Sequence, residues 1–240
     1  MNRWAGSIAF GPNWLLYNGP IGPTGAHAHH ADQIIVSALA EPLEVEAGSQ
    51  PLCGAVIRIP SDVRHSIRQG AGLADVLFIE STRNALDRDD CLWRLGAPRA
   101  ITDWRTAVDR AASIQQIVVP VDQVESSAVA HPAVDTTLAL LPDLVVDGAV
   151  SARLLAELVG LSPSRLSHLF VRQTGVPIRS YVRWARLRLA TESLSHGETL
   201  TSAAHTAGFS DSSHFSRTFR SMFGLSPTDV FAGSAFLTPD

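Results

Sequence analysis

The C-terminal part of the chain repeats one pattern of apolar positions, in which a short helix, a tight turn and a longer helix follow one another. In segment 211–223, Phe215 and Phe219 are four residues apart, which predicts a helix with one buried face. Asp211 is a good N-cap for this helix, and Gly208 ends the helix before it. The opposite face carries short hydroxyl side chains near its start and arginines further along. That chemistry suits a helix that enters a DNA major groove.

A similar arrangement of helix-starting and helix-ending residues occurs roughly fifty residues earlier in the chain. Ser162 followed by Pro163 gives an N-cap with proline at the first helical position, and Gly175 closes the helix. The internal repeat therefore predicts an all-α domain with two helix–turn–helix pairs joined by a long helix. Its predicted helices are 151–159 with 162–174, Pro177 to Leu194, and 200–207 with 211–223.

Residues 8–80 show short runs rich in Val, Ile and Leu, separated by turn residues. Strands at spacings of about ten residues predict a small antiparallel sandwich or barrel. From about Thr82 the period becomes helical, so the fold class is α+β. The predicted strands are 34–40, 42–46, 55–59 and 74–80, with a turn at 47–51. The predicted helices are 84–95, 103–118 and 133–141, the last ending near Pro142. The expected domains are 1–118 and 132–240, with the polar segment 119–131 as linker.

The net charge of -4 divides unequally along the chain. Residues 150–229 hold nine Arg against five acidic residues, a balance of +4. Residues 1–149 hold ten Arg against seventeen acidic residues, a balance of -7, and Asp240 adds the last -1. The basic part is therefore confined to the helical region, as expected when one module of two meets DNA phosphates.

The cysteine spacing and the hydropathy of the chain argue against a disulfide scaffold, a four-thiolate zinc site and a membrane-spanning segment. The two cysteines, Cys53 and Cys91, lack the spacing of a disulfide scaffold or a four-thiolate zinc site, and Cys53 is expected to be a buried structural thiol. Two free thiols suit the reducing cytoplasm. No apolar run approaches the roughly 18–20 residues that span a bilayer, so no membrane partner is expected.

The helical region, about residues 131–233, resembles the DNA-binding domain of the AraC/XylS family of transcription regulators. LAELVGLSPSRLSHLFVRQTGVPIRSYVRWARLRLA (155–190) resembles the first helix–turn–helix and the connecting helix. AAHTAGFSDSSHFSRTFRSMFGLSPTDV (203–230) resembles the second and the family signature. The positions that match the family pattern are Gly208, Phe209, Phe215, Arg217, Phe219, Gly224, Ser226 and Pro227.

This resemblance implies a sequence-specific transcription regulator, more often an activator than a repressor, with double-stranded DNA and RNA polymerase as partners. Two recognition helices would enter successive major-groove segments about 34 Å apart. Arg217 is the candidate for bidentate contact with guanine, and Arg172 and Arg220 for phosphate. Arg186 is expected to make a structural ion pair. The DNA-facing set is Ser164, Arg165, Ser167, His168, Arg172, Ser212, Ser213, Ser216, Arg217 and Arg220.

The N-terminal region resembles the cupin barrel through HAHH (27–30) and GAVIRIPSDVRHSIRQ (54–69). Asp62 stands where the cupin motif usually has Gly, and Gln33 stands near the usual Glu. The resemblance implies a cupin-like antiparallel barrel with flanking helices that binds an unidentified small-molecule effector. The candidate effector residues are His27, His29, Gln33 and His65; the candidate ligands of a divalent metal are His27, His29 and His65.

Several alternatives stay open at this point. The histidines line a pocket for an organic effector, bind a divalent metal, or form an exposed cluster. The alternative function is a metal-dependent cupin enzyme with an accessory helical DNA-binding domain. The missing Glu and the second helix–turn–helix favour a non-enzymatic regulator. Helices within 84–118 offer Trp93, Leu95 and Trp104 either to a homodimer interface or to the barrel.

Overall fold

The computed structural model describes residues 4–11, 14–37, 41–47, 50–80, 131–148 and 150–236. The chain divides into two compact units: Met1–Val121 with Phe219–Asp240, called the sheet unit, and Asp122–Thr218, called the helical unit. Helix α8 (Ser212–Phe223) begins in the helical unit and ends in the sheet unit. The predicted helices 84–95 and 103–118, the linker 119–131 and the proposed dimer contacts lie outside the described residues.

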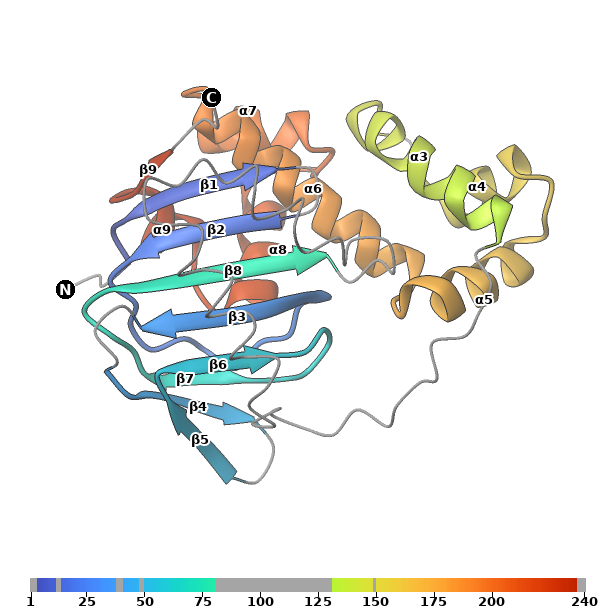
Figure 1. Cartoon of the computed structure of the whole chain (residues 1–240). Helices are drawn as coiled ribbons and strands as arrows, with labels where there is room; N and C mark the ends of the chain where they lie inside the picture. Colours follow the sequence, from blue (N-terminus) through green and yellow to red (C-terminus); the bar gives the residue numbers. More distant parts are fainter. Residues whose placement is uncertain are drawn as a thin grey trace. The chain divides into compact units, whose positions relative to one another are not determined.

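The sheet unit is built from mainly antiparallel strands that pair as two sheets, and the described strands do not close into one barrel (Figure 1). The six-stranded sheet has the order β6-β3-β8-β2-β1-β9, and the three-stranded sheet has the order β5-β4-β7. The expected combination of N-terminal strands and C-terminal helices is confirmed. The strands are β1 (Ser7–Gly11), β2 (Trp14–Gly19), β3 (Ala31–Ser37), β4 (Leu43–Ala47), β5 (Gln50–Gly54), β6 (Val56–Ile59), β7 (Ser66–Gln69), β8 (Ala74–Glu80) and β9 (Ala235–Phe236).

Side-chain alternation explains the sheet core. In β4, Leu43 and Val45 are buried while Glu44 between them is partly exposed, the period of two that a strand with one buried face requires. Strand β5 overlaps the turn that was expected at 47–51. Its Cys53 is exposed, so the expectation of a buried thiol is wrong. The reason is that β5 is an edge strand of the three-stranded sheet and Cys53 lies on its outer face.

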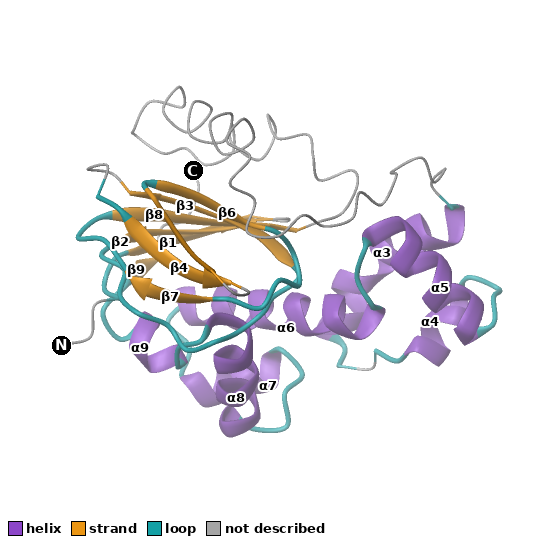
Figure 2. Cartoon of the chain, turned by 90° about the horizontal axis from the view of Figure 1, so that it is seen from below, coloured by secondary structure: helices purple, strands orange, loops and turns teal. Residues whose placement is uncertain are grey.

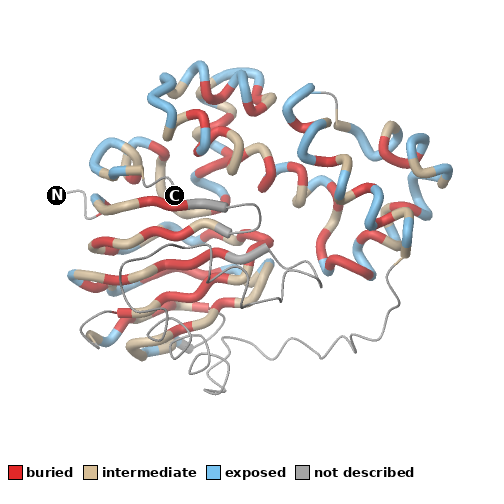
Figure 3. The backbone as a smooth tube through the Cα atoms, turned by 45° about the horizontal axis from the view of Figure 1, so that its top comes forward, coloured by how far each residue is buried: buried red, intermediate tan, exposed pale blue. Residues whose placement is uncertain are grey.

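The helices of the helical unit begin and end close to the residues predicted from the sequence. Ser162 accepts a hydrogen bond from the Arg165 amide as N-cap of α5, and Gly175 ends that helix in the left-handed conformation. The helices between residues 132 and 195 bury one side against a shared core around Leu166 and Phe170 and expose the other (Figure 3). The helices of the whole unit are α3 (Pro132–Val146), α4 (Ala152–Leu158), α5 (Pro163–Thr174), α6 (Ile178–Ser195), α7 (Leu200–Thr206) and the first part of α8.

Two expectations in this unit are wrong. Helix α3 does not end near Pro142 but continues to Val146, because Leu141 and Val145 are buried in the core on either side of the exposed proline. Arg186 has no carboxylate partner among the described residues. Its Nη2 instead donates to the Gly148 carbonyl at 3.4 Å.

The chain returns to the sheet unit after α8. A short helix, α9 (Pro227–Phe231), is held by a capping box between Ser226 and Asp229, and β9 then pairs in parallel with β1. Figure 2 shows α9 and the last turn of α8 lying against the strands of this unit. Among the described helices, none combines the length and the apolar character that crossing a membrane requires.

Candidate functional site

Most residues of the predicted DNA-facing set lie on outer helix faces. On α5, Ser164, Arg165, His168 and Arg172 are exposed and Ser167 is partly exposed, opposite the buried Leu166 and Phe170. On α8, Ser213, Arg217 and Arg220 are exposed, while Ser212 and Ser216 are partly exposed. The two faces therefore have the polar side chains free of the core, as a surface that contacts DNA requires.

The start of α8 is fixed by its predicted N-cap. An Asp211 carboxylate oxygen accepts a hydrogen bond of 2.6 Å from the His214 amide, and this bond holds the pKa of the Asp211 carboxyl below its usual range. One hydroxyl on the helix is already engaged: Ser216 Oγ donates to the Ser212 carbonyl at 2.7 Å. The Arg217 side chain is longer than those of the serines around it, so its guanidinium group extends furthest from this part of the helix face.

A hollow in the helical unit gathers positive charge that the sequence interpretation missed. Arg179, Arg183 and Arg186 follow one side of α6 at spacings of four and three residues, and His214 of α8 lines the same space. Its empty volume is about 760 Å³, including space open to solvent. The arginine spacing in the sequence was the available signal. These guanidinium groups are further candidates for phosphate contact.

Three buried histidines of the sheet unit converge. His27 and His65 exchange both backbone hydrogen bonds, each 2.9 Å long, across an isolated antiparallel bridge, which places their rings 4.1 Å apart. His29 lies two residues further on, and its ring centroid is 5.2 Å from that of His65. Each is only 2% exposed, so an exposed cluster is excluded. One potential ligand atom from each residue lies within 4.8 Å of those from the other two.

The hydrogen bonds of the three rings share one arrangement. Nδ1 faces a backbone carbonyl in each: Gly25 at 2.7 Å for His27, Ala31 at 2.8 Å for His29 and Val63 at 2.9 Å for His65. A neutral imidazole that donates from Nδ1 carries its lone pair on Nε2. The Nε2 of His65 is buried and has no hydrogen-bond partner among the described residues. The Nε2 of His29 lies 3.0 Å from the Gln33 side-chain oxygen.

Burial keeps these imidazoles neutral. It lowers the pKa of His27 to about 4 and that of His65 to about 3, and it also lowers the pKa of His29. Neutral rings at neutral pH are available as metal ligands without losing a proton. The same rings are polar, uncharged groups that a buried organic ligand could contact.

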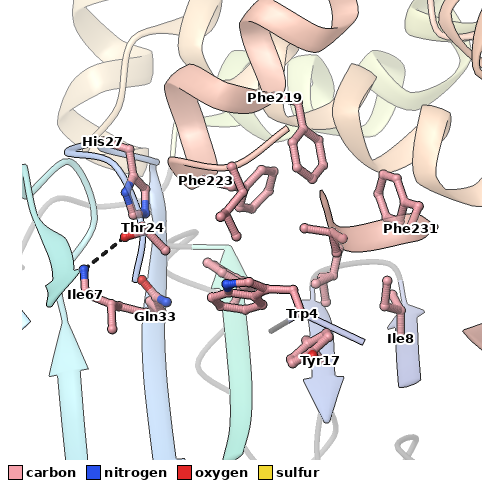
Figure 4. Close-up of a pocket in the computed structure, with 14 residues that line it drawn as sticks. Trp4, Ile8, Tyr17, Thr24, His27, Gln33, Ile67, Phe219, Phe223 and Phe231 are labelled. Atoms are coloured by element: carbon pink, nitrogen blue, oxygen red, sulfur yellow. Dashed lines mark hydrogen bonds between the residues drawn. The ribbon is translucent and has the colours of Figure 1, made fainter. Parts of the chain in front are cut away.

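An apolar pocket lies beside the cluster, within the sheet unit (Figure 4). His27 and Gln33 line it, whereas His29 and His65 are not among its lining residues. Its empty volume is about 530 Å³, including space open to solvent. The buried indole N–H of Trp4 has no hydrogen-bond partner among the described residues. The other lining residues are Ile8, Leu15, Tyr17, Thr24, Ile67, Phe78, Phe219, Phe223, Leu225, Val230 and Phe231.

The end of α8 packs against this site. The Phe223 ring lies 5.4 Å from the Phe78 ring and 6.4 Å from the His29 ring. Gly224, which follows the helix with a φ of 69°, accepts a hydrogen bond of 3.0 Å from the Gly25 amide. A Cβ atom on Gly224 would overlap the Gly25 carbonyl oxygen and lie 2.7 Å from the Nδ1 of His27. The helix that carries Arg217 therefore ends against the histidine cluster.

Comparison with known proteins assigns the helical part. A family model described as a helix-turn-helix domain matches residues 155–233. The activator RhaS of Escherichia coli O139:H28 is 40% identical over 97 residues, which are 40% of this chain and 34% of RhaS. The arabinose operon regulatory protein of Escherichia coli K12 is 32% identical over 112 residues, which are 43% of this chain and 37% of that protein. Residues 155–233 form a helix-turn-helix domain of the AraC type.

The AraC-type domain is only part of the chain, since the matched residues make up 40–43% of it. The chain spans just over a third of the length of these relatives. The fold as a whole has a wider likeness. ToxT from Vibrio cholerae O395 superposes with a TM-score of 0.54 and 10% identity over 92% of this chain and 98% of the ToxT chain. A similar fold thus recurs in a solved structure of very different sequence.

Sequence reasoning selected the histidines but missed their neighbours. The cupin resemblance pointed to His27, His29 and His65 from two motifs, and the structure brings them together. It gave no indication that Trp4, Phe223 and the residues after the AraC-type α8 complete the adjoining pocket. The Ser226–Asp229 spacing before an apolar run was a signal for α9, whose Val230 and Phe231 line that pocket.

Proposed function

We propose that the protein is a transcription regulator, and more specifically an activator, whose AraC-type domain binds double-stranded DNA through α5 and α8. The α4–α5 and α7–α8 pairs then act as two helix-turn-helix motifs in successive major-groove segments about 34 Å apart. The observation that carries this proposal is the AraC-type match over residues 155–233, with exposed polar faces on both candidate helices. The relative RhaS is itself named a transcriptional activator, which supports RNA polymerase as a further partner.

The DNA contacts divide by chemistry. Arg217 reads guanine through its two-pronged guanidinium group, a contact that contributes about 1–3 kcal/mol of discrimination. Arg172 and Arg220, near the ends of their helices, bind phosphate, and Arg179 and Arg183 extend the phosphate-binding surface. Serine hydroxyls and His168 supply shorter polar contacts. The proposed set remains Ser164, Arg165, Ser167, His168, Arg172, Ser212, Ser213, Ser216, Arg217 and Arg220.

The sheet unit supplies the regulatory input. We assign it a cupin-like role in which a small effector occupies the apolar pocket beside His27 and Gln33. The lining favours a compact, largely apolar or aromatic molecule with one hydrogen-bond acceptor for the Trp4 N–H. ToxT has been crystallised with an unsaturated fatty acid. Because that likeness concerns the fold alone, the ligand chemistry proposed here comes from this pocket.

The histidine cluster fits a divalent metal. Three neutral imidazoles, each oriented by a backbone carbonyl on Nδ1, form the ligand set that zinc, iron, copper or nickel accept. One candidate ligand atom from each ring already lies within 4.8 Å of those from the other two, so ring movements could bring each of them to the Zn–N distance of about 2.0–2.1 Å from one shared ion. Gln33 offers a weak fourth ligand, as its sequence position suggested.

The DNA-binding proposal is tested by titrating the full-length protein into labelled DNA from upstream of its own gene and into random DNA. Arg217→Ala should weaken specific binding by about 5- to 150-fold, equivalent to the 1–3 kcal/mol of one bidentate base contact, and change random binding far less. Arg68→Ala, which removes an exposed ion pair with Glu46 in the sheet unit, is the control and should change neither. Equal losses of specific and random binding would make Arg217 a phosphate contact.

The convergent imidazoles also favour one alternative, a metal-dependent cupin enzyme with the AraC-type domain as an accessory. Such an enzyme would turn over substrate after loading with iron, manganese or nickel, and loss of His65 would abolish the turnover. Metal loading without turnover, together with specific DNA binding, would leave the regulator as the function.

A further inference from the structure

A chain of contacts connects the histidine cluster with the end of α8. Its first link is the His27 ring, whose Nδ1 donates to the Gly25 carbonyl oxygen at 2.7 Å. Its second link is the Gly25 amide, which donates to the Gly224 carbonyl oxygen at 3.0 Å. Gly224 directly follows α8, and its own amide donates to the Arg220 carbonyl at 2.9 Å. Only two residues therefore separate a candidate metal ligand from the helix that carries Arg217.

The fit at this junction is tight. Gly224 has no room for a side chain, because a Cβ atom there would overlap Gly25 and crowd His27. Phe223 adds ring contacts with Phe78 and, at 6.4 Å, with His29. A change in the position of the His27 ring or of the Gly25 peptide must therefore be transmitted to Gly224, since closely packed groups cannot absorb it.

A metal ion acts on the first link. Binding at Nε2 withdraws electron density from the imidazole and makes its Nδ1–H a stronger donor, the relation that fixes histidine ligands to carbonyl groups in metal proteins. It also joins three rings, which are otherwise held by separate hydrogen bonds, into one cross-linked group. Both effects hold the Gly25 peptide in the position from which its amide reaches Gly224.

We propose that a divalent metal bound by His27, His29 and His65 is a regulatory ligand that clamps the C-terminal end of α8 to the sheet unit through Gly25 and Gly224. The clamp orders the helix before DNA arrives. Because DNA then binds a helix that has already lost part of its freedom, metal and DNA should bind with positive cooperativity. The contacts that form the clamp all lie within the sheet unit, whereas its effect on DNA binding rests on the function proposed above.

The clamp is tested on full-length, metal-stripped protein with and without one equivalent of zinc. Zinc should remain bound at one ion per chain after gel filtration, and amide hydrogen exchange in residues 219–226 should slow by about 5-fold or more, the lower end of common coupling between sites. Failure to bind zinc, or bound zinc with unchanged exchange in this segment, would overturn the clamp. This measurement needs no variant and no DNA.

Variants separate the metal site from the connection. His65→Ala should lose zinc and with it the slowing of exchange, whereas His205→Ala, an exposed histidine on α7, should retain both. Gly25→Pro keeps all three imidazoles but removes the amide that donates to Gly224. It should bind zinc and show no slowing in residues 219–226. Retained slowing in Gly25→Pro would show that the effect takes another route and would overturn the assigned connection.

The regulatory consequence is measured by fluorescence anisotropy on the DNA used for the Arg217 test. Zinc should lower the dissociation constant of the wild-type protein about 5-fold or more and leave Gly25→Pro unchanged. Slowed exchange with no change in DNA affinity would overturn the regulatory part. An absence of DNA binding with and without zinc would instead overturn the proposed function, while the exchange result would still decide the clamp.

Discussion

At the scale of single residues, Gly224 shows how one position serves both local and tertiary structure. Its φ of 69° ends α8 in the left-handed conformation, which favours glycine in any sequence. Its missing side chain also leaves space for Gly25 and His27. The first role could be inferred from the position after an amphipathic helix. The second depends on a contact between residues about 200 positions apart, which no local pattern specifies.

The two roles of Gly224 can be separated with Gly197, which has a φ of 84° and no described atom within 4 Å of the point that a Cβ atom would occupy. Gly197→Ala should cost about 1 kcal/mol, because only the left-handed backbone is strained. Gly224→Ala should cost roughly 1–3 kcal/mol more, because the added methyl group also overpacks the junction. Urea unfolding gives both values. Similar losses of stability for the two variants would show that the packing around Gly224 accommodates the added methyl group.

At the scale of elements, helices were easier to predict than strands because their ends are encoded locally. Ser162, Pro163 and Gly175 mark α5 within one residue of its observed bounds. The strands depend on partners far along the chain: β1 and β2 complete the six-stranded sheet, yet neither was singled out from its local sequence. The division into two sheets likewise follows from long-range pairing, and the cupin resemblance led to the expectation of a barrel.

Helix α3 offers a test of a local rule that packing overrides. Pro142 interrupts the hydrogen bonds inside the helix, so Pro142→Ala should stabilise the helical unit by about 1–2 kcal/mol, after part of proline's roughly 3 kcal/mol helix penalty is offset by unfolded-state entropy. Pro163, at the first position of α5, is compatible with its helix. Pro163→Ala should therefore be neutral or destabilise by less than about 1 kcal/mol. Thermal unfolding of both variants checks the opposite signs.

At the scale of the whole molecule, charge is divided between functions. The DNA-binding role had to be inferred from residues 150–229, because the total charge of -4 argues against a nucleic-acid partner. The candidate site shows the same limit of sequence interpretation. Motif spacing identified the three histidines, but the pocket beside them takes Phe219, Phe223 and Phe231 from the far end of the chain. Only the folded chain joins an N-terminal sensor candidate to the end of a helix that is a candidate for DNA contact.

The charge division predicts how salt acts on the full-length protein. Each phosphate contact releases counterions, so the affinity for DNA should fall steeply between about 50 and 200 mM salt despite the acidic total charge. Arg172→Ala should weaken specific and random DNA alike and reduce the slope of log affinity against log salt by about 1. Glu44→Gln also changes the net charge by one, but in β4 of the sheet unit, and should leave the slope unchanged. Arg172→Ala lowers the net charge and Glu44→Gln raises it, so slope changes of similar size and opposite sign would mean that total charge controls binding. A change confined to Arg172→Ala would instead locate the phosphate contacts on the AraC-type domain.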